Sequence, residues 1–368
     1  MDRISIELRK SSDKLSIATS NFVGMESRVQ ELSSYLDLGQ SNHVRFIGIC
    51  GMGGIGKTTL ARIVYERFSF EFEGKSFIAD VREGQNKHGL VPLQEQLLSQ
   101  ILMQRNTTIL DSFDGINNIK KMLCHKKVLI ILDDVNQMKQ LKSLVGMRSW
   151  FGKGSRIIVT SRDEHLLISH GVDKIYRVKS LNHVEAFHLF CLKAFKNVKY
   201  EDDYLELANH FVDYANGLPL AIDILGSFLY GRSVDEWRSA LERLKEIPNK
   251  EIMEKLYISF DGLEETEKKI FLDIACFFKG EEEECVKRVL RSCGLCPDIG
   301  LRVLMDKSLI TVSNGRVWMH DLLQDMGRQI VRQECNDEPG RRSRLWLYKD
   351  ISWVLLNDTV STELFLFL

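Results

Sequence analysis

The sequence has no marked excess of charge of either sign, because 50 lysines and arginines are balanced by 51 aspartates and glutamates. A chain with this balance has no general attraction to nucleic acid or to an anionic membrane. No apolar stretch approaches the roughly 20 residues that span a bilayer, and the first residues lack the apolar core of a signal peptide. Any affinity for a phosphate group must therefore come from a local site.

The eight cysteines are scattered along the chain, and several lie inside apolar runs, as Cys50, Cys191 and Cys276 do. Since no secretory signal precedes them, we expect reduced thiols in a cytoplasmic protein, with an additional nuclear location left open. Cys293 and Cys296 have the spacing of a zinc or redox pair, but no second pair accompanies them. We therefore do not expect a metal there.

The length of 368 residues exceeds what one ordinary core requires and predicts about two or three domains. Hydrophobic residues make up 44% and charged residues 27%, as is typical of a globular protein rather than a disordered one. Residues 1–20 are polar and rich in serine and lysine, so we interpret them as a linker.

Between residues 21 and 178, short apolar runs alternate with longer stretches of helical spacing. The runs are rich in β-branched residues and almost continuous, as strands buried in a parallel sheet are. This alternation predicts an α/β domain whose parallel sheet is covered by helices on both faces. The predicted strands are 44–50, 76–81, 128–132, 156–160 and 175–178.

The rest of the chain is mainly helical. Residues 179–255 carry apolar residues at i, i+3 and i+4 spacing, punctuated by glycine and proline, and predict a small helical domain. Residues 256–345 are again helical but end in two short alternating runs joined by Ser313, Asn314 and Gly315. Asn-Gly between such runs is a strong hairpin signal, and helices followed by a hairpin predict a winged-helix domain. Residues 346–368 form a short tail.

The strongest functional signal is a glycine-rich segment between a predicted strand and a predicted helix. It matches G-x-x-x-x-G-K-[ST], the pattern of a phosphate-binding loop (P-loop). Glycines allow the loop to bring backbone N–H groups onto phosphate oxygens, and the following helix adds its positive end. Lys57 should reach the β- and γ-phosphates, and Thr58 should place its hydroxyl on Mg²⁺. The predicted nucleotide-binding residues of this loop are Gly51, Met52, Gly53, Gly54, Ile55, Gly56, Lys57, Thr58 and Thr59.

Two further predicted strands are followed by charged residues. The third strand leads to Asp133, which we assign to Mg²⁺, and to Asp134, which we expect to orient or deprotonate the attacking water. The fourth delivers Arg162 to the carboxyl end of the sheet, where its guanidinium could contact a γ-phosphate. Asp134, Lys57 and Arg162 are therefore the predicted catalytic residues. As alternatives, the two acids cap the next helix, and Arg162 pairs with a neighbouring acid at the surface.

These elements resemble the NB-ARC family, the nucleotide-binding core of plant disease-resistance receptors and of apoptosome-forming proteins. The resemblance runs from about residue 20 to about residue 350, with several motifs in the family's order. The stretch from Asn21 to Glu26 is similar to the motif that folds over the adenine, so Val23 and Gly24 are predicted to bind the nucleotide. The other matching stretches are Gly217–Leu220, Lys269–Phe278, Met319–Asp321 and Pro339–Trp346.

Finer details resemble the subclass whose receptors begin with a TIR domain and end in leucine-rich repeats. Asn136 follows the Asp-Asp-Val segment where coiled-coil receptors typically have tryptophan, and the stretch Ile270–Phe278 is also typical of the TIR subclass. No TIR segment precedes residue 20, and no repeats follow residue 350. The sequence thus resembles a TIR-NBS-LRR protein without these two parts, as a fragment, a truncated gene product or a natural short form would be, and the given residues include none for NAD cleavage.

The resemblance implies a switch that holds ADP at rest, is activated by exchange for ATP and is reset by slow hydrolysis. Pro219 would pack on the adenine and His320 would reach the β-phosphate of ADP, although a plain turn proline and a structural histidine at a helix start also explain these residues. The implied partners are an adenine nucleotide and either another copy of the chain or another immune receptor, without membrane or nucleic acid. The competing functions are a non-switching adaptor or decoy that pairs with a full-length receptor, and a conventional P-loop ATPase.

Overall fold

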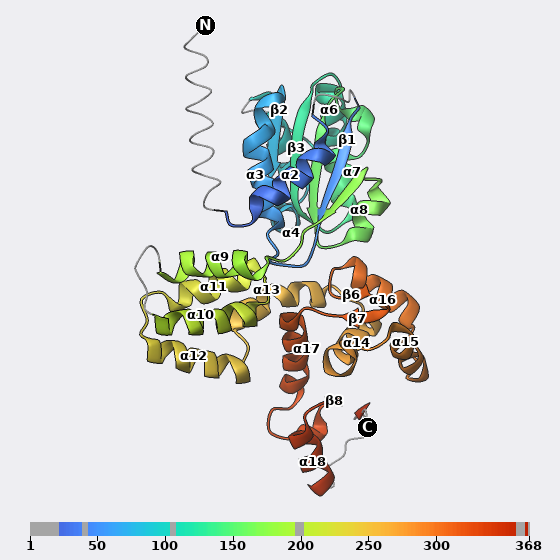
Figure 1. Cartoon of the computed structure of the whole chain (residues 1–368). Coiled ribbons are helices and arrows are strands. Elements are labelled where there is room, and N and C mark those ends of the chain that lie inside the picture. The colour runs from blue at the N-terminus through green and yellow to red at the C-terminus, as the bar shows by residue number, and fades with distance from the viewer. Residues whose placement is uncertain (1–21, 39–42, 104–107, 196–201, 358–364, 367–368) are drawn as a thin grey trace. The chain divides into compact units, whose positions relative to one another are not determined.

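The computed structural model describes residues 22–38, 43–103, 108–195, 202–357 and 365–366 (Figure 1). The predicted linker 1–20 and much of the predicted tail beyond residue 357 lie outside the described residues. The chain divides into two compact units at Lys179 and Ser180, except that Met52–Gly54 is grouped with the second unit. Within the described ranges, no helix combines the length and the apolar character that crossing a membrane requires.

The first unit is built on a parallel sheet of five strands in the order β2-β3-β4-β1-β5. Apart from the edge strand β5, the strands are largely buried, as their β-branched, continuous apolar sequences require. Because β4 lies between β1 and β3, the carboxyl ends of these three strands are neighbours at one edge of the sheet. The strands are β1 (Arg45–Cys50), β2 (Gly74–Ile78), β3 (Val128–Val135), β4 (Arg156–Ser161) and β5 (Lys174–Arg177).

Two strand ends differ from the sequence prediction. The second strand ends at Ile78 rather than Val81, because Asp80 adopts a left-handed backbone (φ 47°) and Val81 already begins a helix. The third strand continues through its acidic pair to Val135, with an irregularity in its pairing to β4 between Leu132 and Val135. Both differences arise from single residues with positive φ, which apolar periodicity does not reveal.

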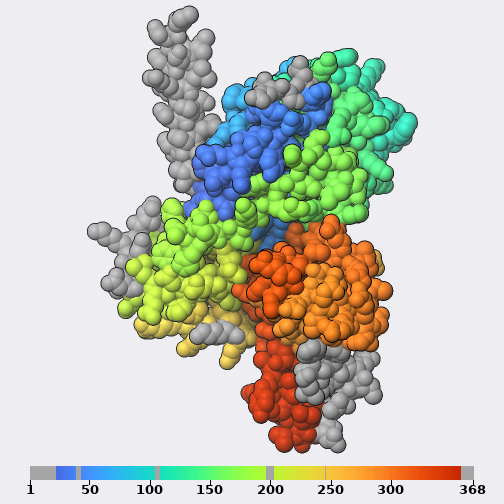
Figure 2. Space-filling view, turned by 45° about the vertical axis from the view of Figure 1, so that its right-hand side comes forward, coloured from blue at the N-terminus to red at the C-terminus, as the bar shows by residue number. Residues whose placement is uncertain are grey.

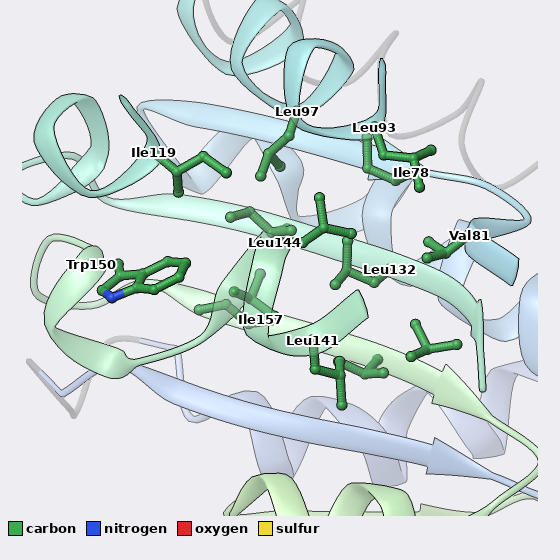
Figure 3. Close-up of a cluster of buried hydrophobic side chains, with 14 of the residues drawn as sticks. Ile78, Val81, Leu93, Leu97, Ile119, Leu132, Leu141, Leu144, Trp150 and Ile157 are labelled. Atoms are coloured by element: carbon green, nitrogen blue, oxygen red, sulfur yellow. The ribbon is translucent and has the colours of Figure 1, made fainter. Parts of the chain in front are cut away.

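Helices cover both faces of the sheet (Figure 1), which confirms the predicted α/β domain. Figure 3 shows one layer of the core, where Ile78 and Leu132 of the sheet meet Leu97, Leu144 and other apolar side chains. The helices are α2 (Met25–Leu36), α3 (Lys57–Phe68), α4 (Val81–His88), α5 (Val91–Leu102), α6 (Ser112–Leu123), α7 (Met138–Val145) and α8 (Glu164–His170), with short 3-10 turns at Ser69–Glu71 and Arg148–Trp150.

Helix α2 lies on the surface of the first unit, next to the edge strand β5. Tyr176 of β5 donates its hydroxyl hydrogen to Glu31 Oε2 (2.9 Å), and its ring packs edge-on against Tyr35. Figure 2 shows this helix, in dark blue, beside the green residues that precede position 180. The contact fixes the start of the described chain to the sheet.

The second unit begins with five helices, and the first three of them contact a tryptophan of the fourth. Trp237 is only 1% exposed, and its indole Nε1 donates a hydrogen bond to Leu229 O (3.0 Å), so the ring's polar atom is satisfied. Aromatic side chains of the neighbouring helices surround it, among them Phe190 and Phe211. The helices are α9 (His183–Phe195), α10 (Asp202–Ala215), α11 (Pro219–Leu229), α12 (Val234–Glu246) and α13 (Lys250–Asp261).

A second group of helices and a hairpin follow. Asn314 (φ 53°) and Gly315 (φ 71°) form the hairpin turn, and both have the left-handed backbone that a tight two-residue turn requires. The hairpin is thus formed as the Asn-Gly signal predicts. The elements are α14 (Glu265–Asp273), a π-helical turn (Ile274–Phe278), α15 (Glu283–Ser292), α16 (Pro297–Asp306), β6 (Thr311–Ser313), β7 (Arg316–Trp318) and α17 (Asp321–Glu334).

The segment after α17 is fixed by buried arginines. Arg344 Nε donates to Asp273 Oδ1 (2.6 Å), and the guanidinium also reaches Lys269 O (3.2 Å). Arg342, equally buried, pairs with Asp350 (2.8 Å). These two arginines therefore serve packing contacts. The elements here are a 3-10 turn (Pro339–Arg341), β8 (Arg344–Leu345), α18 (Tyr348–Asn357) and β9 (Phe365–Leu366).

Candidate nucleotide-binding site

The P-loop connects β1 to α3 through glycines with positive φ. Gly51 (φ 154°), Gly54 (φ 79°) and Gly56 (φ 97°) have backbones that other residues rarely adopt. Helix α3 begins at Lys57 without a side-chain cap, so its first N–H groups are directed into the loop rather than to a capping residue. This arrangement suits a phosphate group at the start of the helix.

Lys57 is almost fully buried at the loop, with 7% of its surface exposed. Its ammonium donates to Gly51 O (2.7 Å), a carbonyl of the same loop. Burial, followed by the positive charge of Arg162, lowers the pKa of Lys57 to about 8. An anionic ligand would favour the charged form again, so the ammonium is placed to bind a phosphate.

Thr58 and Asp133 form an oxygen pair that fits a magnesium ion. The hydroxyl Oγ1 of Thr58 lies 2.9 Å and 3.0 Å from the two carboxylate oxygens of Asp133. Asp133 is 1% exposed, and burial raises its pKa, so a cation beside it would stabilise its charged form. Mg²⁺ usually binds one or two protein oxygens together with phosphate oxygens and water, which is the set that this pair would complete.

The two consecutive acids of β3 have different partners. Asp133 accepts a hydrogen bond from the Thr160 hydroxyl on β4 (2.6 Å), whereas Asp134 has a left-handed backbone (φ 53°) and donates its N–H to the same hydroxyl (2.8 Å). Asp134 Oδ1 lies 3.6 Å from Arg162 Nε. The carboxylate of Asp134 therefore faces the residue that we predicted to contact a γ-phosphate.

Arg162 follows β4 and is largely buried. Burial lowers its pKa, while the charge of Asp134 acts in the opposite direction. The two neighbouring acids that the sequence offered as alternative partners have other roles, since Asp163 caps α8 at Leu166 N (3.1 Å) and Glu164 pairs with Arg177. Arg162 is thus paired with Asp134 beside the P-loop lysine.

Arg82 belongs to the same cluster, although we did not predict it. Its Nη2 atom lies 2.7 Å from Asp134 Oδ2, and it extends from the first turn of α4. The carboxyl end of β2, two strands away from β4, precedes this helix. A basic residue directly after a parallel strand was the available signal, since Arg82 follows the predicted strand 76–81, but we did not use it.

Several predicted site residues belong to the second unit or to the start of the first. Gly24 (φ 72°) precedes α2, and Val23 lies directly before it. Pro219 is the first residue of α11, a position that suits proline because no N–H is needed there. His320 caps α17: its Nδ1 accepts the N–H of Leu322 (3.2 Å). The roles predicted for these residues toward adenine and β-phosphate stay predictions.

The ring of His320 also contacts the turn before α11. Because Nδ1 accepts a hydrogen bond, the neutral ring carries its proton on Nε2, which then donates to Asn216 O (3.0 Å). Burial lowers the pKa of His320, in agreement with a neutral ring. Asn216 Nδ2 donates to Asp321 Oδ2 (2.7 Å), and Lys279 forms an ion pair with Asp321. We call these four residues the Asn216 cluster.

Comparison with known proteins places these features in a family. The model of the NB-ARC domain matches residues 25–199, and that of the winged-helix domain of "Disease resistance protein Roq1-like" matches residues 264–335. The chain is 45% identical over 330 residues to disease resistance protein RUN1 of Vitis rotundifolia and 42% identical over 367 residues to TMV resistance protein N of Nicotiana glutinosa. The chain belongs to the NB-ARC disease-resistance family. This confirms the resemblance and the winged-helix domain that the motifs predicted.

The NB-ARC chain spans only part of these relatives. The matches cover 89% and 98% of this chain but 25% of RUN1 and 31% of protein N. The fold is also found in a Walker-type ATPase of Pyrococcus abyssi, with a TM-score of 0.56, 14% sequence identity and coverage of 83% of this chain and 96% of that one. At this identity, the likeness shows a shared fold alone.

Proposed function

We propose that this NB-ARC chain is an ADP/ATP switch of plant innate immunity, bound to ADP at rest and activated by exchange for ATP, with slow hydrolysis resetting it. The observation that carries the proposal is the grouping of Lys57, Thr58 and Asp133 at the carboxyl ends of β1 and β3, the parallel strands on either side of β4. These groups match the charges and donors that a nucleotide tail with Mg²⁺ requires. The family membership supports a nucleotide-binding module in immune signalling.

The binding step follows from the charges of the site. Phosphate oxygens would accept hydrogen bonds from the N–H groups of the P-loop. A phosphate oxygen would also replace Gly51 O as the partner of the Lys57 ammonium. When bound, Mg²⁺ supplies positive charge between the phosphate oxygens and the Thr58–Asp133 pair. Burial disfavours the charged forms of the Asp133 carboxylate and the Lys57 ammonium, and the opposite charges of Mg²⁺ and phosphate would stabilise those forms.

The discrimination between ADP and ATP rests on Arg162. In the absence of a γ-phosphate its partner is Asp134. A γ-phosphate offers a more highly charged partner at the same end of the sheet, so Arg162 would move from Asp134 to the nucleotide. A nucleotide shifts a conformational equilibrium only through its different affinity for the two states, and this exchange of partners supplies such a difference.

Nucleotide binding is testable on the purified chain by calorimetry with Mg²⁺. We expect the Lys57→Ala variant to bind ADP about 10- to 100-fold more weakly, the effect of losing one charge-assisted hydrogen bond. The exposed lysine of α6, changed as Lys121→Ala, is the matched control and should bind ADP as the parent does. If the folded parent takes up neither ADP nor ATP, the proposed function is wrong.

A further inference from the structure

Two guanidinium groups from different elements contact the single carboxylate of Asp134. Arg82 Nη2 is 2.7 Å from Oδ2, and Arg162 Nε is 3.6 Å from Oδ1, so each carboxylate oxygen has its own cationic neighbour. The exposed fractions of the three side chains are 24%, 21% and 19% for Arg82, Arg162 and Asp134. At this burial the attraction is screened less than in a surface ion pair.

The fold fixes the backbone from which the Arg82 side chain extends. Asp80 turns the chain sharply after β2, and α4 starts at Val81, whose side chain is fully buried against the sheet core. Arg82 is the next residue. Its neighbour Glu83 is paired with Lys87 one turn along the same helix, outside the Asp134 contact. The helix therefore presents Arg82 alone to Asp134.

A γ-phosphate would attract Arg162 more strongly than Arg82, because the two residues follow different strands of the sheet. Arg162 follows β4, next to the P-loop strand β1, whereas Arg82 follows β2 on the far side of β3. The charge of Arg162 acts on Lys57, which places it at the phosphate-binding end. A γ-phosphate would thus draw Arg162 away from Asp134 and leave Arg82 as the remaining cation on that carboxylate.

We propose that Arg82 is a positioning residue that slows hydrolysis by keeping one oxygen of Asp134 engaged. This inference rests on the proposed ATP-binding function. In hydrolysis the water oxygen bonds to the γ-phosphorus, the bond from that phosphorus to the bridging oxygen breaks, and its electron pair leaves with ADP. The water proton passes to Asp134 and then to solvent. A carboxylate oxygen that is already paired with a guanidinium group is a poorer acceptor for that proton, because the neighbouring positive charge stabilises the unprotonated carboxylate.

The consequence is a site that binds ATP well but turns it over slowly. In this proposal, Arg162 contacts the γ-phosphate in the ATP-bound state, and Arg82 slows the hydrolysis that ends this state. A slow step of this kind lengthens the lifetime of the active form without any added affinity for nucleotide. The rate would therefore be controlled by a residue outside the P-loop and outside the acidic pair.

The experiment compares ATP turnover by the full chain and its Arg82→Ala and Arg82→Lys variants, with Lys87→Ala as a control from the same helix. Arg82→Ala should raise kcat about threefold to tenfold, as expected for loss of one partly buried ion pair, with KM for ATP within about twofold of the parent. Arg82→Lys keeps the charge and should lie between the two. Lys87→Ala should match the parent.

A second comparison ties the effect to Asp134. If Arg82 acts through this carboxylate, the double variant with Asp134→Asn should turn over no faster than Asp134→Asn alone. The proposal is overturned if Arg82→Ala leaves kcat unchanged or lowers it, if KM changes instead, or if the acceleration survives in the double variant. Calorimetry on the same samples distinguishes failure of this inference from failure of the proposed function. If the parent binds no nucleotide, both the proposed switch and the proposed role of Arg82 are refuted.

Discussion

Thr160 joins the two acids of β3 through one hydroxyl group. Its Oγ1 donates to Asp133 Oδ1 (2.6 Å) and accepts the N–H of Asp134 (2.8 Å). The side chain is fully buried, so water does not replace it easily. Because both contacts depend on a single oxygen, Thr160 fixes the direction of the Asp133 carboxylate, which we propose to bind Mg²⁺, and the backbone turn that places Asp134 among the arginines.

Replacing this hydroxyl by a methyl group is a sharp test, since valine has nearly the same shape. We expect Thr160→Val to lower the free energy of unfolding by about 1–3 kcal/mol, because the N–H of Asp134 is left without its partner in a buried place. Thr160→Ser keeps the hydroxyl and should cost less. Chemical denaturation followed by circular dichroism measures the difference, and equal stability of the two variants would show that the hydroxyl is dispensable.

Among single residues, the local sequence pattern was sufficient to predict some members of the site but not others. Lys57 and Thr58 lie within one motif, and Asp133 ends an apolar run, so their neighbours in sequence identify them. Arg82 follows a predicted strand, but its neighbours in sequence do not reveal its contact with Asp134. Its contact with Asp134 depends on where β2 stops, and a left-handed turn at Asp80 decides this. Such a turn at an aspartate leaves no periodic signal.

The turn between α10 and α11 and the start of α17 are held together by the Asn216 cluster. Asn216 (φ 45°) and Gly217 (φ 72°) end α10 with left-handed backbones, which exposes the Asn216 carbonyl to His320 and its amide to Asp321. Two helical groups that are separate in sequence thus share one polar contact. We expect this contact to belong to the ADP-bound resting state.

The contact can be weakened without straining the backbone. Asn216→Gly keeps the positive φ and the carbonyl but removes the amide that donates to Asp321. We expect ADP to dissociate about threefold to tenfold faster, as measured by displacement of a fluorescent ADP analogue. Asn209→Ala is the control, because the amide of Asn209 bonds only the carbonyl of Leu205 in its own helix. An unchanged release rate would separate this contact from nucleotide retention.

The sequence predicted the presence and the order of helices and strands more accurately than it predicted where they begin and end. The buried strands are continuous apolar runs, and the helices have clear spacing, so their order and the parallel sheet could be predicted. The pairing irregularity in β3 could not, because it accompanies the positive φ of Asp134, and the apolar pattern does not show which aspartate adopts this conformation. The hydrogen bond that the Asp134 N–H donates to Thr160 Oγ1 stabilises it.

For the whole molecule, assembly distinguishes the switch from the adaptor that the sequence left as an alternative. We expect native mass spectrometry to find the purified chain with ADP bound, and a larger assembly after exchange to ATP, since the nucleotide would shift the equilibrium between two states. The Lys57→Ala variant should not change its mass distribution with ATP. The same stoichiometry in ADP and in ATP would favour the adaptor.

The buried pair of Arg344 and Asp273 has a consequence for how movement spreads through the second unit. A half-withdrawn guanidinium would strand the Asp273 carboxylate in apolar surroundings, at a cost of about 3–5 kcal/mol. The segment around Leu345 is therefore either bound to α14 through Arg344 or detached from it, and intermediate positions are unfavourable. Because Arg344 binds both Asp273 and Lys269 of α14, a displacement of this segment would displace α14 as well.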